Sequence, residues 1–497
     1  MNEFTQYVKS TLLLAFLVVW MNPTTAAERR PNIIVIMADD LGYADVGCYG
    51  CKDIPTPNID QLAADGVRFT SAYVTGNMCG PSRAGFLTGR VQSTFGYYRN
   101  VNNPYDPAQG LPNMPTITSL LQEQGYVTGG VGKWHMGTAN HQHPNAMGFD
   151  DWFGFLGGGL MYFPLDHRSY QGKFTLLQRP LHHKYIQHTM PVIHNNKVVP
   201  WEQYLTRELT DAGVAFLDRN QNEPFFLFMS YNAPHLDLEA PKETIAKYPE
   251  DKMTKVPGVT AKSRSIYGAM VDELDQGIGK LLAKVEALGL EDDTVVWFLS
   301  DHGGMKKTSD NRPLRGNKGN SYEGGLRVPM IVKWPGKTPK DKAIRDKATK
   351  GKVLDAPVTS LDIGATSLAM AGGDPHESGL HGKDIRSYIS GHSDEAPHDV
   401  LFWYTGGYKE PSGAMREGDY KMLHTGKTSE LYNLKDDLSE TTNLAASEPD
   451  RLASMLSRWK KWASGSQPEL WQNSGTTIQF ANYEWLKGSP HYKETKN

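Results

Sequence analysis

The sequence predicts an α/β protein with a large, doubly wound, mostly parallel sheet and a smaller C-terminal α+β subdomain. Short apolar runs of strand length alternate with amphipathic segments through most of the chain, which is typical of folds whose helices cover both faces of a sheet. Near its C-terminal end the chain changes to short strands separated by turn-like breaks. A chain of 497 residues is also long for one compact core. We therefore expect a main domain over residues 28–396 and a subdomain over residues 397–497.

Residues 1–27 have the features of a signal peptide. Lys9 precedes the apolar run 12–20, and the small residues 25–27 form a plausible cleavage site before Glu28. The apolar run is too short for a comfortable membrane span, and no other stretch is long and apolar enough to cross a bilayer. We expect an exported protein, periplasmic or secreted, with no membrane span in the mature chain. An uncleaved N-terminal anchor is the alternative.

The charge balance and the cysteines narrow the class of protein further. The chain has 52 Lys and Arg against 55 Asp and Glu, for a net charge of −3, which argues against a general nucleic-acid binder. Cys48 and Cys51 are close enough in sequence for a local disulfide, which export would permit but which the spacing does not prove. Cys79 is left without a sequence neighbour to pair with.

Four predicted buried strands each lead into ionisable residues. In open α/β sheets, the carboxyl ends of the strands form the edge where ligands bind. Any one of these residues could be a helix cap or a solvated surface group, but four such strand ends together favour a single site. The strands 33–38, 126–131, 224–229 and 294–299 lead respectively to Asp39 and Asp40, to Lys133 and His135, to His235, and to Asp301 and His302.

The remaining predicted elements fill the gaps between these strands. Amphipathic spacing predicts helices over 56–66, 117–124 and 263–288, and residues 67–69 form a short strand. Residues 382–396 are the expected connection between the two parts. The C-terminal part is predicted to contain strands over 400–404, 414–416, 420–423 and 430–432 and a helix over 451–462.

The stretch 77–90 is predicted to be a turn that leads into a short helix. Pro81 suits the first helical turn and Gly89 suits its end. Cys79 then lies at the helix N-terminus, where the helix dipole and the nearby Arg83 would lower the pKa of its thiol. A half-buried structural cysteine is the usual alternative for a single Cys.

This stretch resembles the Cys-x-Pro-Ser-Arg-x-x-x-Leu-Thr-Gly-Arg signature of type I sulfatases at every fixed position. The resemblance extends over nearly the whole mature chain, including Leu431-Tyr432-Asn433-Leu434. It implies an alkaline-phosphatase-like fold and conversion of Cys79 to formylglycine, an aldehyde whose hydrate is the nucleophile. A formylglycine-generating or equivalent maturation enzyme would then be a partner.

The resemblance also implies a metal site. It maps Asp39, Asp40, Asp301 and His302, together with modified Cys79, onto the family's metal ligands. Carboxylate oxygens suit Ca²⁺ or Mg²⁺, whereas the imidazole of His302 leans toward transition metals. Ca²⁺ is the first choice, and the presence of a divalent cation is the firmer expectation.

Further motifs match catalytic positions of the family. The lysine upstream of Glu-Gly-Gly, which contacts the sulfate in sulfatases, is Lys318 here; Gly-Lys-Trp-His supplies Lys133 and His135, and Ala-Pro-His supplies His235. The implied mechanism is hydrolysis of a sulfate ester. In it Lys133 and Arg83 hold the nucleophilic oxygen, His235 protonates the departing alcohol, and His135 takes the proton that releases the sulfate.

The substrate is predicted only as a class. The segment from Phe149 to Val199 is rich in Gly, His, Tyr and Phe, and His167 and Arg168 are its candidate substrate contacts. A surface excursion without a binding role is the alternative for this segment. Export, the even charge and aromatic-rich loops favour a sulfated carbohydrate. A phosphomonoester or phosphonate hydrolase, and an inactive sulfated-glycan binder with unmodified Cys79, are the other two readings.

Overall fold

The computed structural model describes residues 30–102, 106–164, 191–334, 351–406 and 411–471. The predicted signal peptide and the candidate contacts His167 and Arg168 lie outside these residues. Among the helices described, none has both the length and the apolar character needed to span a bilayer.

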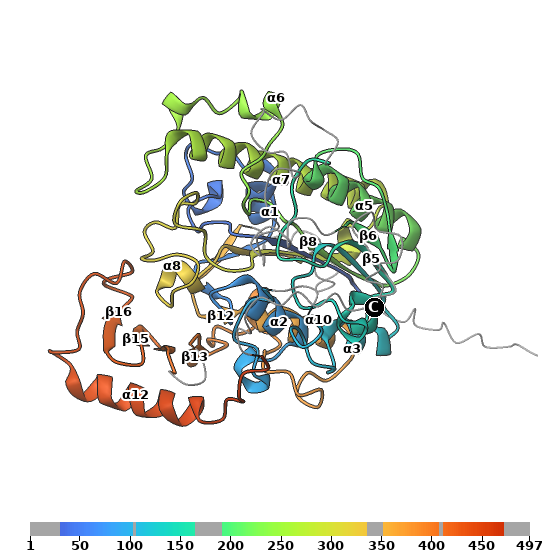
Figure 1. Cartoon of the computed structure of the whole chain (residues 1–497). Helices are drawn as coiled ribbons and strands as arrows, with labels where there is room; N and C mark the ends of the chain where they lie inside the picture. Colours follow the sequence, from blue (N-terminus) through green and yellow to red (C-terminus); the bar gives the residue numbers. More distant parts are fainter. Residues whose placement is uncertain (1–29, 103–105, 165–190, 335–350, 407–410, 472–497) are drawn as a thin grey trace, which may run out of the picture.

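A twisted sheet of ten strands forms the centre of the molecule (Figure 1), in the order β11-β2-β10-β9-β1-β8-β4-β5-β6-β7. The five neighbours β9, β1, β8, β4 and β5 are parallel, while β10 and the short strands β6 and β7 run antiparallel to their neighbours. The sequence prediction of a large, mostly parallel sheet is confirmed. Its strands are β1 (Asn32–Ala38), β2 (Val67–Phe69), β4 (Val127–Lys133), β5 (Asp151–Phe155), β6 (Ile193–His194), β7 (Lys197–Val198), β8 (Phe225–Ser230), β9 (Thr294–Ser300), β10 (Met330–Lys333) and β11 (Lys352–Leu354).

Helices cover both faces of this sheet. In Figure 1, α1, α5 and α7 lie above it, and α2, α3 and α10 lie below it. A separate pair of strands, β3 (Ala72–Tyr73) and β12 (Val358–Thr359), lies beside the main sheet. The long helices are α1 (Pro57–Asp65), α2 (Cys79–Thr88), α3 (Ile117–Glu123), α5 (Leu205–Asn220), α7 (Ala261–Ala287) and α10 (Ser360–Ala371). The short ones are α6 (Lys242–Ile245), α8 (Glu323–Leu326), α11 (Arg386–Ser390), η1 (Gly47–Tyr49), η2 (Gln92–Phe95), η3 (Asn140–Gln142), η4 (Pro144–Met147), η7 (Glu250–Lys252) and η8 (Glu291–Asp293).

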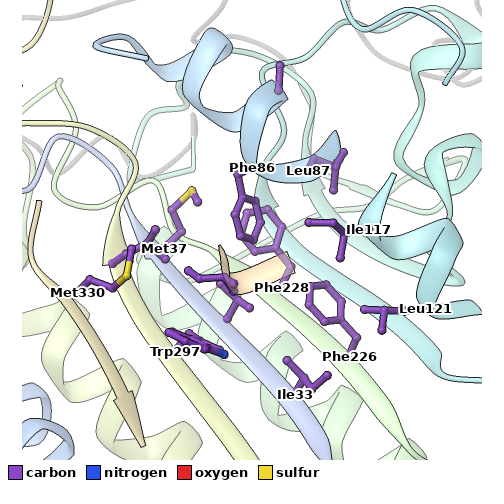
Figure 2. Close-up of a cluster of buried hydrophobic side chains, with 14 of the residues drawn as sticks. Ile33, Met37, Phe86, Leu87, Ile117, Leu121, Phe226, Phe228, Trp297 and Met330 are labelled. Atoms are coloured by element: carbon purple, nitrogen blue, oxygen red, sulfur yellow. The ribbon is translucent and has the colours of Figure 1, made fainter. Parts of the chain in front are cut away.

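The central strand β1 divides the core into two layers, because successive side chains of a strand point to opposite faces. Its alternate residues Ile33, Val35 and Met37 belong to the layer between the sheet and helices α2 and α3. The residues between them belong to the layer between the sheet and α7. Figure 2 shows the first layer, in which Phe86 of α2 packs on Phe228 of β8 with ring centroids 5.2 Å apart. The helix that begins at Cys79 is thereby fixed on the sheet.

The C-terminal part is a four-stranded antiparallel sheet covered by one helix. The sheet is formed by β13 (Val400–Tyr404), β14 (Gly413–Glu417), β15 (Tyr420–His424) and β16 (Ser429–Asn433). Helix α12 (Pro449–Ala463) packs its buried Met455 and Trp459 against this sheet. The predicted α+β subdomain is confirmed, and each of its strands extends at most one residue beyond the prediction at either end.

The segment after α12 returns to the main domain. The Gln467 backbone N–H donates to Ser93 O (2.9 Å), and the Leu470 N–H donates to Gly96 O (3.0 Å). The Trp471 ring meets Tyr97 edge-on, with centroids 4.8 Å apart. Residues from the last tenth of the chain therefore hold the segment that directly follows α2.

Several predicted boundaries differ from the structure. Strand β4 runs two residues further than the predicted strand 126–131, so Lys133 is the last residue of the strand. The segment 149–199 begins with a strand, β5, because Trp152 and Phe155 fill the core. Cys48 and Cys51, whose pairing the sequence left open, are both free thiols.

Candidate active site

Helix α2 places Cys79 at the carboxyl edge of the sheet. The helix begins at Cys79 and ends where Gly89 adopts a positive φ of 63°, a conformation that glycine takes at little cost. Every residue of α2 is buried, and Cys79 is 1% exposed. The Gly80 N–H is satisfied by Asn100 Oδ1 at 2.8 Å. The predicted turn and helix are confirmed, with the sulfur inside the protein.

The ends of four neighbouring strands converge on Cys79. Asp39 and Asp40 follow β1, Lys133 ends β4, and Ser230 ends β8. Strand β9 ends at Ser300, one residue before Asp301. Contacts among the side chains bring together all ten predicted site residues that the structure describes, namely Asp39, Asp40, Cys79, Arg83, Lys133, His135, His235, Asp301, His302 and Lys318.

Four of these residues form a group that could hold a metal ion. Asp39, Asp40, Cys79 and His302 each offer one ligand atom, and the four atoms lie within 4.8 Å of one another. Cys79 Sγ is 3.1 Å from His302 Nε2 and 3.6 Å from Asp39 Oδ1. Asp301, also predicted as a ligand, borders this group, with Oδ1 3.4 Å from His302 Nε2.

The hydrogen bonding around the group fits a divalent cation. Buried carboxylates are costly unless positive charge or donors balance them. Asp40 Oδ2 is buried without a hydrogen-bond partner among the described residues, and its contact with His235 Nε2 is 3.6 Å long. Nδ1 of His302 lies 2.9 Å from Gly303 O. A carbonyl only accepts, so Nδ1 carries a proton and Nε2 is the ring nitrogen that faces the group. A cation bound there would replace the Nε2 proton, which Asp301 and Cys79 otherwise favour by raising the pKa of His302 to about 9 despite its burial.

Three positive side chains lie around Cys79 and the carboxylates of the group. Lys318 Nζ lies 3.3 Å from Cys79 Sγ and 2.7 Å from Asp40 Oδ1. Lys133 pairs with Asp39, and Arg83 Nε donates to Asp301 Oδ2 at 3.0 Å. Nη2 of Arg83 is buried without a hydrogen-bond partner in the described part of the chain. An anion at Cys79 would therefore meet three cations.

These charges shift the pKa values of the group. Burial would raise the pKa of the Cys79 thiol, but Lys133, Lys318 and His302 outweigh it and hold that pKa well below its usual value. Burial also opposes ionisation of Asp39, yet Lys133 lowers the pKa of this carboxyl to about 2. The low thiol pKa expected from the sequence is present, but its main sources are residues far from Cys79 in the sequence.

The two candidate catalytic histidines lie at different depths. Burial lowers the pKa of His135 to about 4, despite the nearby Cys79 sulfur, and neither ring nitrogen has a hydrogen-bond partner among the described residues. The His235 side chain is 13% exposed, and its Nδ1 lies 2.6 Å from Leu236 O. Nε2 of His235 lies on the side of Asp40 that is nearer to the surface, which we call the mouth of the site.

Three supporting residues were not predicted from the sequence. Ser230 Oγ accepts from Arg83 Nη1 and donates to Lys133 O (2.6 Å), which ties β8 to the site. Tyr97 OH donates to His135 O, and Asn100 satisfies the Gly80 N–H. Position at a strand end was a usable signal for Ser230, whereas the other two carry no local signal because their contacts depend on how loops pack.

Comparison with known proteins identifies relatives of this chain. The sulfatase family model matches residues 31–373. Human arylsulfatase D is 30% identical over 467 residues, which covers 80% of this chain and 74% of the relative. The dog N-acetylgalactosamine-6-sulfatase is 31% identical over 411 residues, or 80% of this chain and 72% of the relative. The solved structure of Ps i-CgsB in complex with k-i-k-neocarrahexaose is 36% identical, with a TM-score of 0.79 over 90% of this chain and 96% of that one.

Proposed function

The chain belongs to the sulfatase family of sulfuric ester hydrolases, and we propose that it is an exported enzyme that removes sulfate from a carbohydrate at the Cys79 site. The observation that carries this proposal is the buried sulfur at the start of α2, faced by Arg83, Lys133 and Lys318. Three cations around one position suit an anionic group that gains charge during reaction.

The proposal includes conversion of Cys79 to formylglycine. The full signature around Cys79, its place at a helix N-terminus and its lack of a disulfide partner support this modification. The hydrated aldehyde would supply the hydroxyl that attacks sulfur. Lys133 and Arg83 would hold the nucleophilic oxygen of this hydroxyl, and Lys318 would bind the sulfuryl oxygens.

A divalent cation completes the proposed site, with Ca²⁺ the first candidate. Asp39, Asp40, His302 and modified Cys79 would hold it, with Asp301 as a fifth ligand. The cation would neutralise negative charge on the sulfate oxygens. The buried Asp40 Oδ2, which lacks a hydrogen bond among the described residues, supports this assignment.

The depth of the two histidines supports a division of the proton transfers. His235 is partly exposed at the mouth, where the alcohol must leave, so its Nε2 is placed to protonate that oxygen. His135 is buried beside Cys79 and its low pKa keeps it neutral near pH 7. A neutral imidazole can accept a proton, which suits the step that takes the proton from the hydroxyl and releases sulfate.

The proposed substrate is a sulfated oligosaccharide. The resemblance to Ps i-CgsB, whose solved complex contains k-i-k-neocarrahexaose, makes that sugar the first one to test. His167 and Arg168 stay predicted substrate contacts, and a formylglycine-generating or equivalent maturation enzyme stays a predicted partner.

The test is sulfate release by protein coexpressed with a formylglycine-generating enzyme. Substrates are k-i-k-neocarrahexaose, an aryl sulfate and the matched aryl phosphate, with Cys79→Ala as the inactive control. We expect turnover of both sulfates and none of the phosphate. Preferred turnover of the phosphate would support the phosphomonoester hydrolase reading. Binding of the sugar without turnover, with Cys79 unmodified, would support the glycan binder.

A further inference from the structure

The loop that presents Lys318 lies between the main sheet and the C-terminal sheet. It leads from Arg315 to Glu323, where α8 begins, and Figure 1 shows α8 between the two sheets. The Lys318 N–H donates to Gly304 O (3.1 Å) and the Gly319 N–H to Asn77 O (2.8 Å). The ammonium of Lys318 reaches Cys79 from this loop, so its position depends on how the loop is held.

Glu440, in the turn after β16, contacts both ends of this loop. Its backbone O accepts from Arg315 Nη1 at 2.7 Å, and its Oε2 accepts from the Glu323 N–H at 2.7 Å. Glu440 is 0% exposed and has a positive φ of 51°. Such a conformation is unfavourable for a non-glycine residue and persists only where its surroundings impose it.

A buried lysine balances the charge of Glu440. Lys421 of β15 is 0% exposed and lies between Glu440 Oε1 (3.0 Å) and Glu323 Oε1 (2.8 Å). The other oxygen of Glu323 accepts from Tyr73 OH (2.7 Å) and Arg327 Nη1 (3.2 Å). Buried ion pairs add little net stability compared with apolar residues of similar size, but the partners of each charge restrict its geometry.

We propose that Glu440 is a positioning residue for Lys318, with Lys421 as its counter-ion. Glu440 fixes the two ends of the loop through its own backbone and side chain, so the C-terminal subdomain sets where the Lys318 ammonium meets the sulfate. Two further contacts of the loop with this subdomain act in the same direction, Ser321 Oγ to Thr405 Oγ1 (2.7 Å) and Tyr322 OH to Glu430 Oε2 (2.9 Å). The proposal rests on the proposed sulfatase function, in which Lys318 binds the sulfuryl oxygens.

The test is a double-mutant cycle between Glu440 and Lys318. Glu440→Gln keeps the volume and one acceptor oxygen but removes the charge that faces Lys421. We expect kcat/KM for the sulfate ester to fall by about 10–100-fold, as for other residues that orient a catalytic group. The loss should be absent when Lys318 is already Ala, because Glu440 then has nothing to position. Losses that multiply in the double variant would overturn the proposal.

Inhibition by inorganic sulfate gives a readout that a general structural role would not move. Glu440→Gln should raise the inhibition constant for sulfate in the same direction as Lys318→Ala. Glu417→Gln is the matched control, because Glu417 lies on β14 of the same subdomain and pairs with Arg458 near the surface. Unchanged sulfate inhibition in Glu440→Gln, equal to that of the Glu417→Gln control, would also overturn the proposal.

Arg315→Ala repeats the cycle without disturbing the buried charges. Arg315 is exposed and donates to Glu440 O, so this variant removes one support of the loop and leaves Glu440, Lys421 and Glu323 intact. If Glu440→Gln does not fold, the Arg315→Ala cycle with Lys318→Ala decides the question by the same criterion. A wild-type protein that hydrolyses no sulfate ester would overturn the proposed function, whereas an active wild type with multiplying losses would overturn only the role of Glu440.

Discussion

At the scale of single residues, the surroundings of Cys79 decide which chemistry the site can support. The sulfur is buried, and the positive groups that lower the pKa of the thiol are Lys133, Lys318 and His302. A structural cysteine of the core would instead be surrounded by apolar side chains. The charge around Cys79 therefore favours a reactive role.

Replacement of Cys79 by Ala should abolish turnover and leave the fold nearly intact. The change removes one small buried group, which costs about 1 kcal/mol or less of unfolding free energy. Thermal denaturation and sulfate release on the same preparation measure the two effects. The mass of the tryptic peptide that contains residue 79 should carry the formylglycine change, and active enzyme with only unmodified cysteine would contradict the prediction.

Replacement of His235 by Ala should affect sugar sulfates far more than activated aryl sulfates. A sugar alkoxide is a poor leaving group and needs a proton, whereas a nitrophenolate needs it little. General acid catalysis contributes roughly 10²–10⁴-fold where it is required. The measurement is kcat/KM for both substrates on one preparation, with the exposed His376→Ala as control. Equal losses for the two substrates would mean that His235 binds sulfate or supports the structure.

Glu239 should make the protein less stable as the pH rises. Burial raises the pKa of this carboxyl to about 7, with a smaller contribution from Asp237, although the Tyr162 N–H opposes the shift. The buried group is neutral at low pH, so its cost appears between pH 4.5 and about 7. Glu239→Gln should be more stable than wild type at pH 8 by roughly 1–3 kcal/mol.

Urea denaturation at pH 4.5 and at pH 8 tests this expectation. The two proteins should differ by less than about 0.5 kcal/mol at the lower pH, where Glu239 is protonated in the folded state and about half protonated in the unfolded state. Glu250→Gln is the control, since Glu250 is exposed. A Glu239→Gln protein that differs from wild type equally at both pH values would show that the carboxyl does not titrate as expected.

At the scale of elements, the carboxyl ends of neighbouring strands build the site. The sequence predicts β1, β4, β8 and β9 because apolar runs and the residues after them are local signals. The order β9-β1-β8-β4, which makes these ends neighbours, is a long-range property of the sheet. For the same reason the sequence identified Lys318 by motif but gave no sign of Glu440, which meets its loop only after the two sheets pack.

Gly303 is the point where the end of β9 meets the turn that starts α8. A Cβ at Gly303 would lie 1.8 Å from Gly324 O, closer than any real contact allows. Gly303→Ala should therefore separate the two segments, lower the unfolding free energy by about 1–3 kcal/mol and reduce turnover. Denaturation and activity measure the two effects. Gly465→Ala, whose Cβ would have an ordinary contact, should change neither, and a Gly303→Ala protein as stable and active as wild type would contradict the prediction.

At the scale of the whole molecule, one ion would join distant parts of the chain. The four residues of the metal group come from the segment after β1, from α2 and from the segment after β9. A ligand that binds only the folded protein adds stability in proportion to its affinity and concentration. Chelation should therefore lower both the thermal midpoint and the turnover, and Ca²⁺ should restore them. Elemental analysis that finds no metal, together with a midpoint unchanged by strong chelators, would count against the site.

The order of synthesis also matters, because residues late in the sequence contact segments near Cys79, which is made early. A ribosome adds about 5–20 residues per second, so Cys79 is made tens of seconds before Glu440 and before the segment 467–471 that returns to Ser93 and Gly96. During that interval the contacts of Glu440 and of the segment 467–471 are absent, because these residues do not yet exist. Once the chain is folded, Cys79 is 1% exposed. An enzyme that modifies this cysteine must therefore act on the nascent or unfolded chain.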